Sequence, residues 1–585
     1  MSDEVLDEAR ARRAGLIRLA IGELQAACLF VLHRSWEARD GWAHSYPALF
    51  WSLIAVSALP PLVALSGVTS LRGRTLAIWM SGAALFCAGV AAYDIWRQAP
   101  AGLAPLILSP QAILAMLAAV FIAHHLVMGA DQARRRIAPY SLYFDIAWKD
   151  AVQLALSALF VGVFWLILLL GASLFKLIGI EGFQALIQKD WFIYPATALV
   201  FAGAVHITDV RVSLIRGVRT VGLALLAWLM PLMALIAVGF LAALPFTGLK
   251  PLWDTRSAAT VLLAAAAALI VLINAAYQDG AADNRVPRIL AWAGRGAALV
   301  IGPMIALAGY AVALRVAQYG WTPDRIVALA CVLVGACYAL GYLAAALRRG
   351  DWLKLLERTN VVTAFVALAV IAALFSPLLD PGRISTASQV HRLETGRTPM
   401  ARFDFNFLRF DAGRFGFAAL TRLTHSQTPA IADAARGALA RSSPHAPPTI
   451  GPEARAARIT AYPAGRAVPR SLFTQAWKDR TPTGGCLSSE PKCDAYFVDL
   501  DGDGREEVVL GSTTQLWVYR LGDDGVWVEL GTISGFDCTL IPALRRGEGK
   551  AAPNPWRDLE VAGRRLHLNL WERAPRTPRP ACPKS

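Results

Sequence analysis

Long apolar runs separated by short polar loops fill the chain as far as about residue 379. Each run has about twenty residues or more, enough for a helix to cross a hydrocarbon core of about 30 Å. Because lipid offers the backbone no hydrogen-bond partners, these runs must be helical. The pattern predicts eleven membrane helices, near residues 15–33, 46–67, 76–94, 108–129, 151–178, 193–209, 219–244, 257–277, 289–315, 325–347 and 360–378. Arg18 and Glu23 fall within the first run, so a helix lying in the membrane interface stays an alternative there.

A different pattern follows the last apolar run. Alternation in ARFDFNFLRF (401–410) predicts a strand, and two helical patterns follow near 412–423 and 429–441. Beyond about residue 470, AYFVDL, EEVVLGS, QLWVYRL and VWVELG predict short strands, with a hairpin turn at GDDG (522–525). DLEVAGRRLHLNLW near the end predicts another hairpin.

These patterns predict an α-helical polytopic membrane domain followed by a small soluble, mainly-β C-terminal domain. The expected divisions are a membrane domain (1–379), a membrane-proximal α/β segment (380–441), a Pro-rich linker (442–457) and the mainly-β domain (458–585).

Composition supports a membrane protein. Hydrophobic residues make up 56% of the 585 and charged residues 17%, with a formal net charge of +15. In the membrane half most Lys and Arg lie in alternate loops, so their excess indicates topology and a lipid-bilayer partner rather than nucleic acid. The second, fourth, sixth, eighth and tenth loops hold fifteen Lys and Arg, against seven in the odd-numbered loops.

The loop charges predict an orientation, because positive loops stay in the cytoplasm. Arg10, Arg12 and Arg13 add the N-terminus to the positive side. With eleven crossings the tail beyond residue 380 then lies outside, in the periplasm of a Gram-negative cell. The N-terminus is charged and shows no cleavable signal peptide.

The eight cysteines divide evenly between the two halves. Those in apolar runs are expected to be small packing residues: Cys28, Cys87, Cys331 and Cys337. An even set in an extracytoplasmic tail indicates two disulfides, and the most local pairing joins Cys486 to Cys493 and Cys538 to Cys582. In a cytosolic tail the same four would be thiols or a metal site.

The sharpest local motif is VDLDGDGREEVVL (498–510). Alternating carboxylates on a curled loop converge on one point, as a hard cation requires. The first six positions fit an EF-hand loop, but Leu510 stands where its bidentate Glu belongs, and the flanking segments are predicted strands. The motif is more similar to the calcium loop of FG-GAP and integrin-type propeller repeats. That resemblance implies a Ca²⁺ site formed by Asp499, Asp501, Asp503 and Glu507, with the carbonyl of Arg505. A solvated Asp-Gly turn without metal stays the alternative.

Several ionisable residues lie in or at the ends of the apolar runs. Such groups usually face a cavity or a partner, or extend to the interface. His124 and His125 lie near the inner end of the fourth predicted helix, and His206 near that of the sixth. The three could line one cytoplasmic-side cavity, or they could be hydrogen-bonded between helices. The other members of this group are Asp94, Lys176, Asp209, Arg295 and Arg315.

Longer motifs indicate a family. The segment WLMPLMALIAVGFLAALPFTGLKPLWDTRSAATVLL, then LINAAYQDG, YGWTPDRI, SPLLDPGRISTASQVHRL and FDFNFLRFDAGRFG occur in this order. The chain resembles, from the first helix to about residue 425, a bacterial inner-membrane family catalogued as domain of unknown function 4153. The resemblance implies a many-helix inner-membrane protein with an extracytoplasmic C-terminal part, and brings no activity or catalytic residues.

Function is left open by these motifs. The phosphate-loop, zinc-protease, nucleophile-elbow and dinucleotide motifs are absent. We expect a non-enzymatic membrane protein, a transport path or an envelope scaffold, whose periplasmic domain binds a ligand or an envelope partner. The alternative is a membrane-embedded transferase with a lipid-linked donor, whose acidic residue would come from the first outer loop, RSWEARDGWAHS (34–45), with Glu37 and Asp40.

Overall fold

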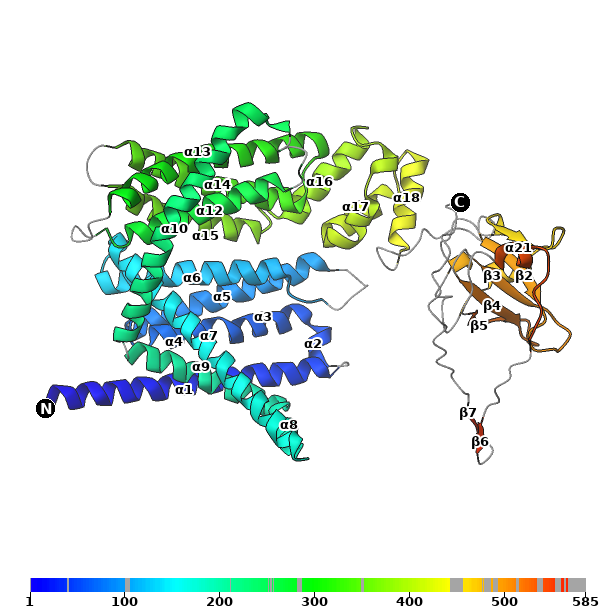
Figure 1. The fold of residues 1–585 in the computed structure, drawn as a ribbon, viewed down its shortest axis with the longest axis horizontal. Helices are drawn as coiled ribbons and strands as arrows, with labels where there is room; N and C mark the ends of the chain where they lie inside the picture. Colours follow the sequence, from blue (N-terminus) through cyan, green and yellow to red (C-terminus); the bar gives the residue numbers. More distant parts are fainter. Residues whose placement is uncertain are drawn as a thin grey trace. The chain divides into compact units, whose positions relative to one another are not determined.

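The computed structural model shows a helical region followed by a small five-stranded sheet, as the sequence predicts (Figure 1). The chain divides into two compact units, residues 1–427 and 428–585. The structure describes residues 2–38, 41–99, 106–210, 212–250, 252, 255, 257–280, 287–348, 352–441, 456–475, 477, 485–487, 493–511, 515–533, 540–552, 559–561 and 564–566.

Eleven spans among the described residues are long and apolar enough to cross a membrane, which confirms the predicted number. One span is broken into two helices, α3 (Pro47–Ala58) and α4 (Pro60–Gly67). The others are α1 (Ser2–Glu37), α5 (Gly73–Gln98), α6 (Pro110–Ala133), α7 (Tyr140–Leu177), α9 (Asp190–Val210), α10 (Val212–Thr247), α12 (Ala258–Tyr277), α13 (Arg288–Tyr319), α14 (Pro323–Leu347) and α15 (Leu356–Leu374). Two short helices, α2 (Trp42–Ser45) and α8 (Gly182–Ile187), lie in loops between spans.

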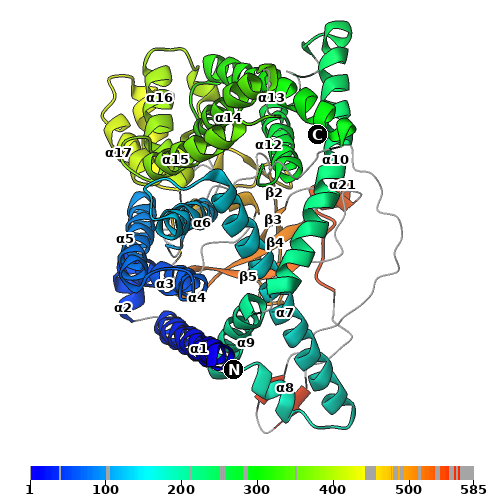
Figure 2. The same ribbon diagram turned by 90° about the vertical axis from the view of Figure 1, so that its left-hand side faces the viewer.

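The spans pack in two groups (Figure 2). Helix α1 packs against α9 and α3, and α3 and α4 pack against α5. In the second group α13 packs against α10, α12 and α14, around the fully buried Leu269, Ile273 and Ile301. Helices α7 and α15 contact members of both groups, so the boundary between the groups runs along them.

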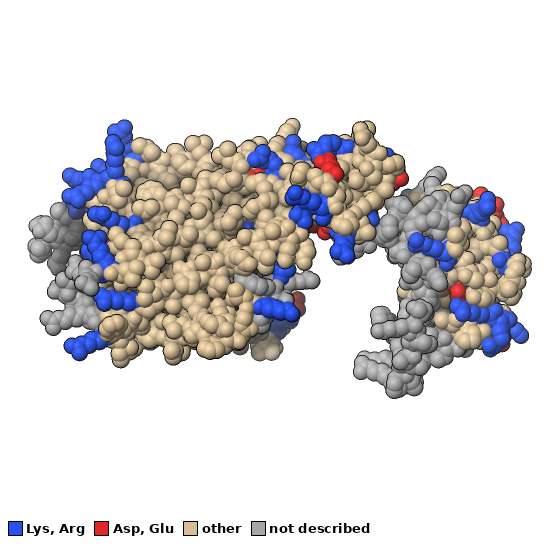
Figure 3. Space-filling model, turned by 90° about the horizontal axis from the view of Figure 1, so that it is seen from above, with Lys and Arg blue, Asp and Glu red and all other residues tan. Residues whose placement is uncertain are grey.

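Large apolar side chains cover much of the outer surface of the spans. Leu177 is 82% exposed and Phe246 is 90% exposed. On the face shown in Figure 3, Lys and Arg gather toward the ends of the helical unit and leave an apolar band between them. A band of this kind is typical of a surface that faces lipid, in agreement with the spans.

The first unit continues past the last span. Helix α16 (Pro381–Glu394) begins at the fully buried Asp380, whose carboxylate accepts bonds from the Arg383 backbone N–H at 2.8 Å and the Tyr93 hydroxyl at 3.1 Å. Tyr93 lies on α5, so this cap attaches the segment to a membrane span. Helix α17 (Gly413–Leu423) packs against both α16 and α5.

The predicted strand at 401–410 is wrong. The chain forms a 3-10 turn (Met400–Arg402) and a π-helical stretch (Phe407–Asp411) there. Asp404 accepts a bond from the Phe407 backbone N–H at 3.0 Å, which starts a helical turn. Phe403 and Leu408 are both buried, and their odd spacing would place them on opposite faces of a strand. The predicted helices near 412–423 and 429–441 are confirmed, as α17 and α18 (Pro429–Leu439).

The second unit holds a five-stranded sheet in the order β1-β2-β3-β4-β5. Strand β1 pairs parallel to β2, and the remaining pairs are antiparallel. The strands are β1 (Ile459–Ala461), β2 (Cys493–Val498), β3 (Glu507–Gly511), β4 (Leu516–Leu521) and β5 (Trp527–Ile533). The four predicted strands and the turn at 522–525 are confirmed. A separate hairpin joins β6 (Leu559–Val561) to β7 (Arg564–Leu566), also as predicted.

Both faces of the sheet carry a core. Val508, Leu510, Trp517 and Tyr519 are buried on one face, with α20 (Ser471–Thr474) and η3 (Gly485–Leu487) nearby. Tyr496, Val509 and Val518 are buried on the other, beside α21 (Ile541–Arg545). A disulfide joins Cys486 to Cys493, as predicted. Cys538 and Cys582 lie outside the described residues, as does most of the predicted linker.

Candidate functional site

A cavity of about 140 Å³ lies between α4, α6, α7 and α9 in the helical unit. Most of its lining is apolar, including Leu62, Val120, Phe121, Leu154 and Phe201. The polar lining residues are Ser66, His124, His125, Asp150 and Gln153. Burying ionisable side chains in an apolar cavity of a membrane domain costs free energy. Their presence therefore makes this cavity a candidate site.

The break between α3 and α4 brings Ser66 to this cavity. Pro60 and Pro61 have no backbone N–H, so they cannot continue the helical ladder of α3. The carbonyl of Ala58 at the break accepts a bond from the Gln25 side-chain amide of α1 at 2.9 Å. Helix α4 therefore begins as a separate helix, held at its start by α1.

His124 is fixed as a neutral imidazole. The indole N–H of Trp79 donates to Nδ1 of His124 at 3.1 Å, and an indole nitrogen can only donate. Nδ1 therefore carries no proton. Nε2 lies 2.7 Å from the Ser66 hydroxyl oxygen, so the Nε2–H donates to it. Both ring nitrogens of His124 are committed to neighbours on α5 and α4.

His125 faces a carboxylate. Its Nδ1 lies 2.6 Å from the Phe121 carbonyl, which can only accept, so Nδ1 carries a proton. Its Nε2 lies 3.3 Å from Oδ2 of Asp150 on α7. Both atoms are buried, and neither has a hydrogen-bond partner among the described residues. They are the two uncommitted polar atoms that face each other in the cavity.

A second cavity, of about 410 Å³, adjoins the first. Phe121 and His125 line both cavities. Six of the sixteen residues that line the second cavity are Phe, Tyr or Trp, among them Tyr140, Tyr143 and Trp148 from α7. It also includes residues of α12, α14 and α15, so the two cavities together extend across the boundary between the helix groups.

A hydrogen-bonded network of asparagine and tyrosine side chains includes three residues that line this second cavity, Tyr140, Asn274 and Asn360. The Tyr140 hydroxyl donates to the Asn274 carbonyl oxygen at 3.0 Å, and the Asn274 amide donates to the Tyr342 hydroxyl at 2.6 Å. Tyr342 donates to Asn360 at 2.8 Å, and the Asn360 amide donates back to Asn274 at 2.6 Å. Four helices, α7, α12, α14 and α15, are joined by this network, and Asn274 hydrogen-bonds to three of its neighbours within it.

His206 does not join the other two histidines. It lies outside the cavity lining, with Nδ1 3.4 Å from a guanidinium nitrogen of Arg18. Arg18 is buried and donates to Asp209 at 2.7 Å, and Lys149 donates to the other oxygen of Asp209 at 2.7 Å. The expectation that three histidines line one cavity is therefore wrong for His206, which faces this ion-pair network instead.

The calcium motif forms a tight acidic loop between β2 and β3. One oxygen each from Asp499, Asp501 and Glu507 can approach within 4.8 Å of one another. The backbone N–H groups of Gly502 and Gly504 donate to Asp499, at 2.7 and 3.0 Å. Both glycines have positive φ, which permits this curl.

The remaining predicted ligands lie differently. Oδ1 of Asp503 accepts the Arg505 backbone N–H at 2.7 Å, and Asp503 is not part of the three-carboxylate group. The guanidinium of Arg505 pairs with Asp523 at 2.6 Å. Glu507 is buried and accepts the Leu500 N–H at 2.7 Å, whereas its neighbour Glu506 faces outward. A hydrogen bond from Arg466 lowers the pKa of Glu506.

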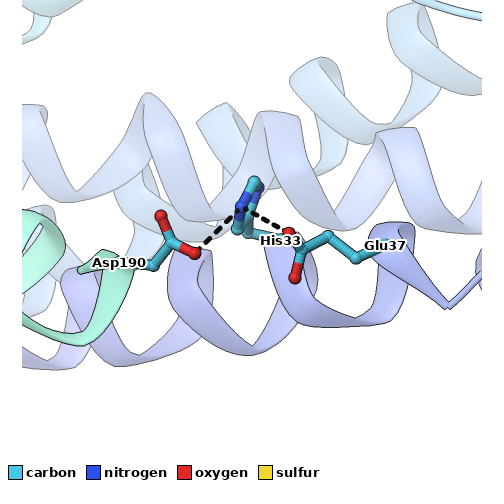
Figure 4. Close-up of side chains that lie close together, drawn as sticks. All are labelled: His33, Glu37 and Asp190. Carbon is cyan, nitrogen blue, oxygen red and sulfur yellow. Dashed lines mark ion pairs between the residues drawn. The ribbon is translucent and has the colours of Figure 1, made fainter. Parts of the chain in front are cut away.

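A second group of potential metal ligands lies where α1 ends and α9 begins (Figure 4). His33 lies between two carboxylates, with Nε2 3.8 Å from Glu37 and 3.6 Å from Asp190. Glu37 also accepts a bond from Arg34 at 2.6 Å. All three side chains of the group are about 36–46% exposed, and Asp40 lies outside the described residues. The contacts of His33 with these two carboxylates are sufficient to explain this arrangement.

Comparison with known families adds one match. A family model described as Domain of unknown function (DUF4153) matches residues 47–424, more than half of the chain. The chain belongs to the DUF4153 family. Comparisons with curated proteins and with solved structures find no match.

The matched region of this DUF4153 protein includes both cavities and the network around Asn274. It ends before the sheet, so the acidic loop lies outside it. Reasoning from sequence missed Asp150, Ser66 and Trp79 as parts of the site. Asp150 lies next to the predicted start of a span, where a carboxylate is ordinary, so only the packing of α6 against α7 identifies it.

Proposed function

We propose that the helical unit of this DUF4153 protein is a transport path for a small molecule. The observation that carries this proposal is that two cavities share Phe121 and His125. The shared residues would form the point at which a bound molecule passes from one helix group toward the other. Because α7 and α15 contact both groups, a rocking motion along them would open one cavity at a time.

The lining supports a mostly apolar molecule with one polar or charged group. Leucine, valine and phenylalanine dominate the first cavity. Apolar burial would supply affinity, and the His125–Asp150 pair would orient the single polar group.

We further propose that the protein lies in a bacterial inner membrane with a cytoplasmic N-terminus and a periplasmic tail. The alternation of loop charges supports this orientation. Reporter fusions after residues 135, 250 and 585 test it. A cytoplasmic signal at 585 would reverse the placement of the tail.

The proposal for the sheet unit is a ligand- or partner-binding module with a Ca²⁺-filled loop. This proposal is supported by Asp499, Asp501 and the buried Glu507, each of which has a carboxylate oxygen within 4.8 Å of the other two. Three carboxylates this close repel one another, and a divalent cation would remove that repulsion. Bound calcium would then stabilise the loop between β2 and β3, and this loop would form part of the surface that binds a partner.

A transferase with a lipid-linked donor is the second candidate. One observation favours it: Glu37, the last residue of α1 before the loop that such an enzyme would use, lies beside His33 and Asp190. Glu37→Gln would then abolish transfer to an acceptor while leaving the cavity around His125 intact. Lipid profiling of a deletion strain complemented with wild type or E37Q tests this, and accumulation of a lipid-linked precursor with E37Q alone would favour the transferase.

Cysteine accessibility tests the transport path. Val205 lines the first cavity and Ala364 the second. In a chain whose eight native cysteines are replaced by alanine, Val205→Cys and Ala364→Cys should both react with a membrane-impermeant maleimide. A lipid-facing control, Leu166→Cys, should stay unlabelled. Failure of both cavity positions to react from either side would contradict a path and favour a scaffold.

A further inference from the structure

We infer that this site exchanges one proton, held between His125 and Asp150, for one monovalent organic cation. This inference rests on the proposed transport function and names its substrate class and coupling ion. It follows from the number of protons the pair can hold, from the charge the cavity is left with, and from the chemistry of the second cavity.

The pair holds one proton in addition to the one on Nδ1 of His125. Without it, the lone pair of Nε2 would face a carboxylate oxygen 3.3 Å away, with no other donor for either atom among the described residues. With it, an N–H or O–H lies between the two atoms and satisfies both. Whether the proton resides on His125 or Asp150, the pair is then neutral overall.

His124 does not share this role. Its Nδ1 accepts the indole N–H of Trp79, so protonation there would break that bond. Its Nε2–H already donates to the Ser66 hydroxyl, and Nε2 lies 3.9 Å from Oδ2 of Asp150. A second positive charge beside His125 would also be repelled. One proton is therefore the capacity of the site.

Loss of that proton leaves the cavity with a charge of −1 on Asp150. The nearby cations are held by carboxylates outside the lining of the cavity: Arg18 and Lys149 share Asp209, which leaves that group with a net charge of +1, and Arg72 pairs with Asp131. Tyr140, Tyr143 and Tyr338 contribute phenol groups, not carboxylates, to the lining of the second cavity. The described lining of the first cavity contains no Lys or Arg. A cation entering from outside would restore neutrality at Asp150.

The second cavity fits an organic cation rather than a metal ion. Six of its lining side chains are Phe, Tyr or Trp, and its described lining contains no carboxylate. Aromatic faces attract cations whose charge is spread over an apolar body, and this attraction strengthens away from water. One such ring already carries a cation, because the guanidinium of Arg219 lies 5.6 Å from the centre of Phe144. A small metal ion would lack the oxygen ligands that it needs.

The exchange balances in charge. The resting site holds one proton and no cation. Entry of a monovalent cation releases that proton to water on the side to which the cavity is open, and the site stays neutral. On the opposite side a proton returns to the pair and the cation leaves. One cycle moves one proton in one direction and one cation in the other.

Calorimetry on the purified full-length protein in detergent tests this, with tetraphenylphosphonium as the probe. The apparent Kd should weaken about tenfold for each unit by which pH falls below the value at which the pair takes its proton, because one proton competes with one cation. Titrations in two buffers of different ionisation enthalpy should give one proton released per probe bound. Tetraphenylmethane, the uncharged analogue, should bind much more weakly and independently of pH.

Three variants separate charge from folding. Asp150→Asn should weaken probe binding at least tenfold and abolish proton release. His125→Gln keeps the carboxylate, so it should still bind the probe with a reduced pH dependence. Asp145→Asn is the matched control, since Asp145 lies on α7 with its side chain 46% exposed and paired with Arg219; it should behave as wild type.

The outcomes are decisive in each direction. Unchanged binding by Asp150→Asn, or equal binding of the uncharged analogue, would overturn the inference. Probe binding with proton release, but no maleimide reaction at Val205→Cys or Ala364→Cys, would support the exchange site and refute transport. Maleimide reaction at both positions without proton release would support transport and refute the proton exchange.

Discussion

Arg18 donates to Asp209 at 2.7 Å, although 191 residues separate them in the sequence. Arg18 is 1% exposed and lies within the first membrane span. The Leu65 carbonyl accepts a second bond from its guanidinium, at 2.9 Å. A charge that looks unfavourable in the sequence is therefore what joins α1 to α4 and α9.

Removal of one partner of this pair should destabilise the helical unit. Asp209→Asn leaves Arg18 and Lys149 without their carboxylate, and breaking a buried pair costs about 3–5 kcal/mol. Thermal unfolding in detergent should show a clear loss of Tm. Asp145→Asn removes an exposed pair, where about 1 kcal/mol or less is expected. Equal Tm values for the two variants would contradict the structural role of Arg18.

Removal of the Trp79 indole should alter the proton capacity of the cavity. Trp79→Phe takes away the donor that keeps Nδ1 of His124 unprotonated, so His124 becomes able to bind a proton. Burial and repulsion by the proton on the His125–Asp150 pair still oppose that second proton, so the pH dependence of tetraphenylphosphonium binding should exceed one proton per probe only at the acidic end of the titration, with affinity at high pH nearly unchanged. Trp96→Phe, at a tryptophan that packs against Tyr93, is the control and should keep the one-proton dependence. An unchanged slope in Trp79→Phe would show that His124 is neutral for another reason.

The aspartates of the acidic loop should differ in how much each contributes to calcium binding. The sequence motif implies Asp503 as a ligand, whereas the structure groups Asp499, Asp501 and Glu507. Equilibrium dialysis of the intact protein with radioactive calcium should show a site of roughly 10⁻⁴–10⁻³ M. Asp501→Asn should abolish this binding, and Asp503→Asn should weaken it less. No saturable binding in the wild type would return the loop to a solvated turn.

Calcium should also stabilise the sheet unit, because the ion binds the folded loop. At tenfold excess over Kd the gain is about 1.4 kcal/mol. Unfolding of the sheet, followed in the intact protein, should occur at a higher temperature with calcium than with chelator. Mg²⁺ should substitute poorly, because it demands tighter octahedral geometry. Identical curves in calcium and chelator would contradict the site.

The tail cysteines test the proposed compartment. If the tail is periplasmic, a non-reducing digest of the membrane-extracted protein should yield a peptide linking Cys486 to Cys493. Thiol blocking during extraction excludes later oxidation. Two free thiols at these positions would place the tail in a reducing compartment and contradict the orientation derived from loop charge.

The spans and strands could be predicted because each depends on a local pattern. A run of about twenty apolar residues allows few structures in lipid, and Asp-Gly turns separate the strands in the tail. The strand predicted around Phe403 and Leu408 was wrong because the alternation there also fits a helical turn. The hydrogen bond that Asp404 accepts favours the turn.

The cavity depends on contacts between distant segments, so only part of it could be predicted. Two adjacent histidines within an apolar run can be recognised from the sequence as candidate site residues. Trp79 and Asp150 cannot, because a tryptophan and a carboxylate are ordinary near the ends of spans. The packing of α4, α5 and α7 around α6 brings these residues together, and no spacing within one segment encodes it.

Proton-driven exchange in proteoliposomes tests the central claim most directly. Vesicles containing the full-length protein and an acidic interior are placed in alkaline medium with radiolabelled tetraphenylphosphonium. Wild type and Asp145→Asn should accumulate the probe above protein-free vesicles while protons leave, and accumulation should stop when the pH gradient is dissipated. Asp150→Asn should match protein-free vesicles. Accumulation by Asp150→Asn equal to that of wild type would contradict the account.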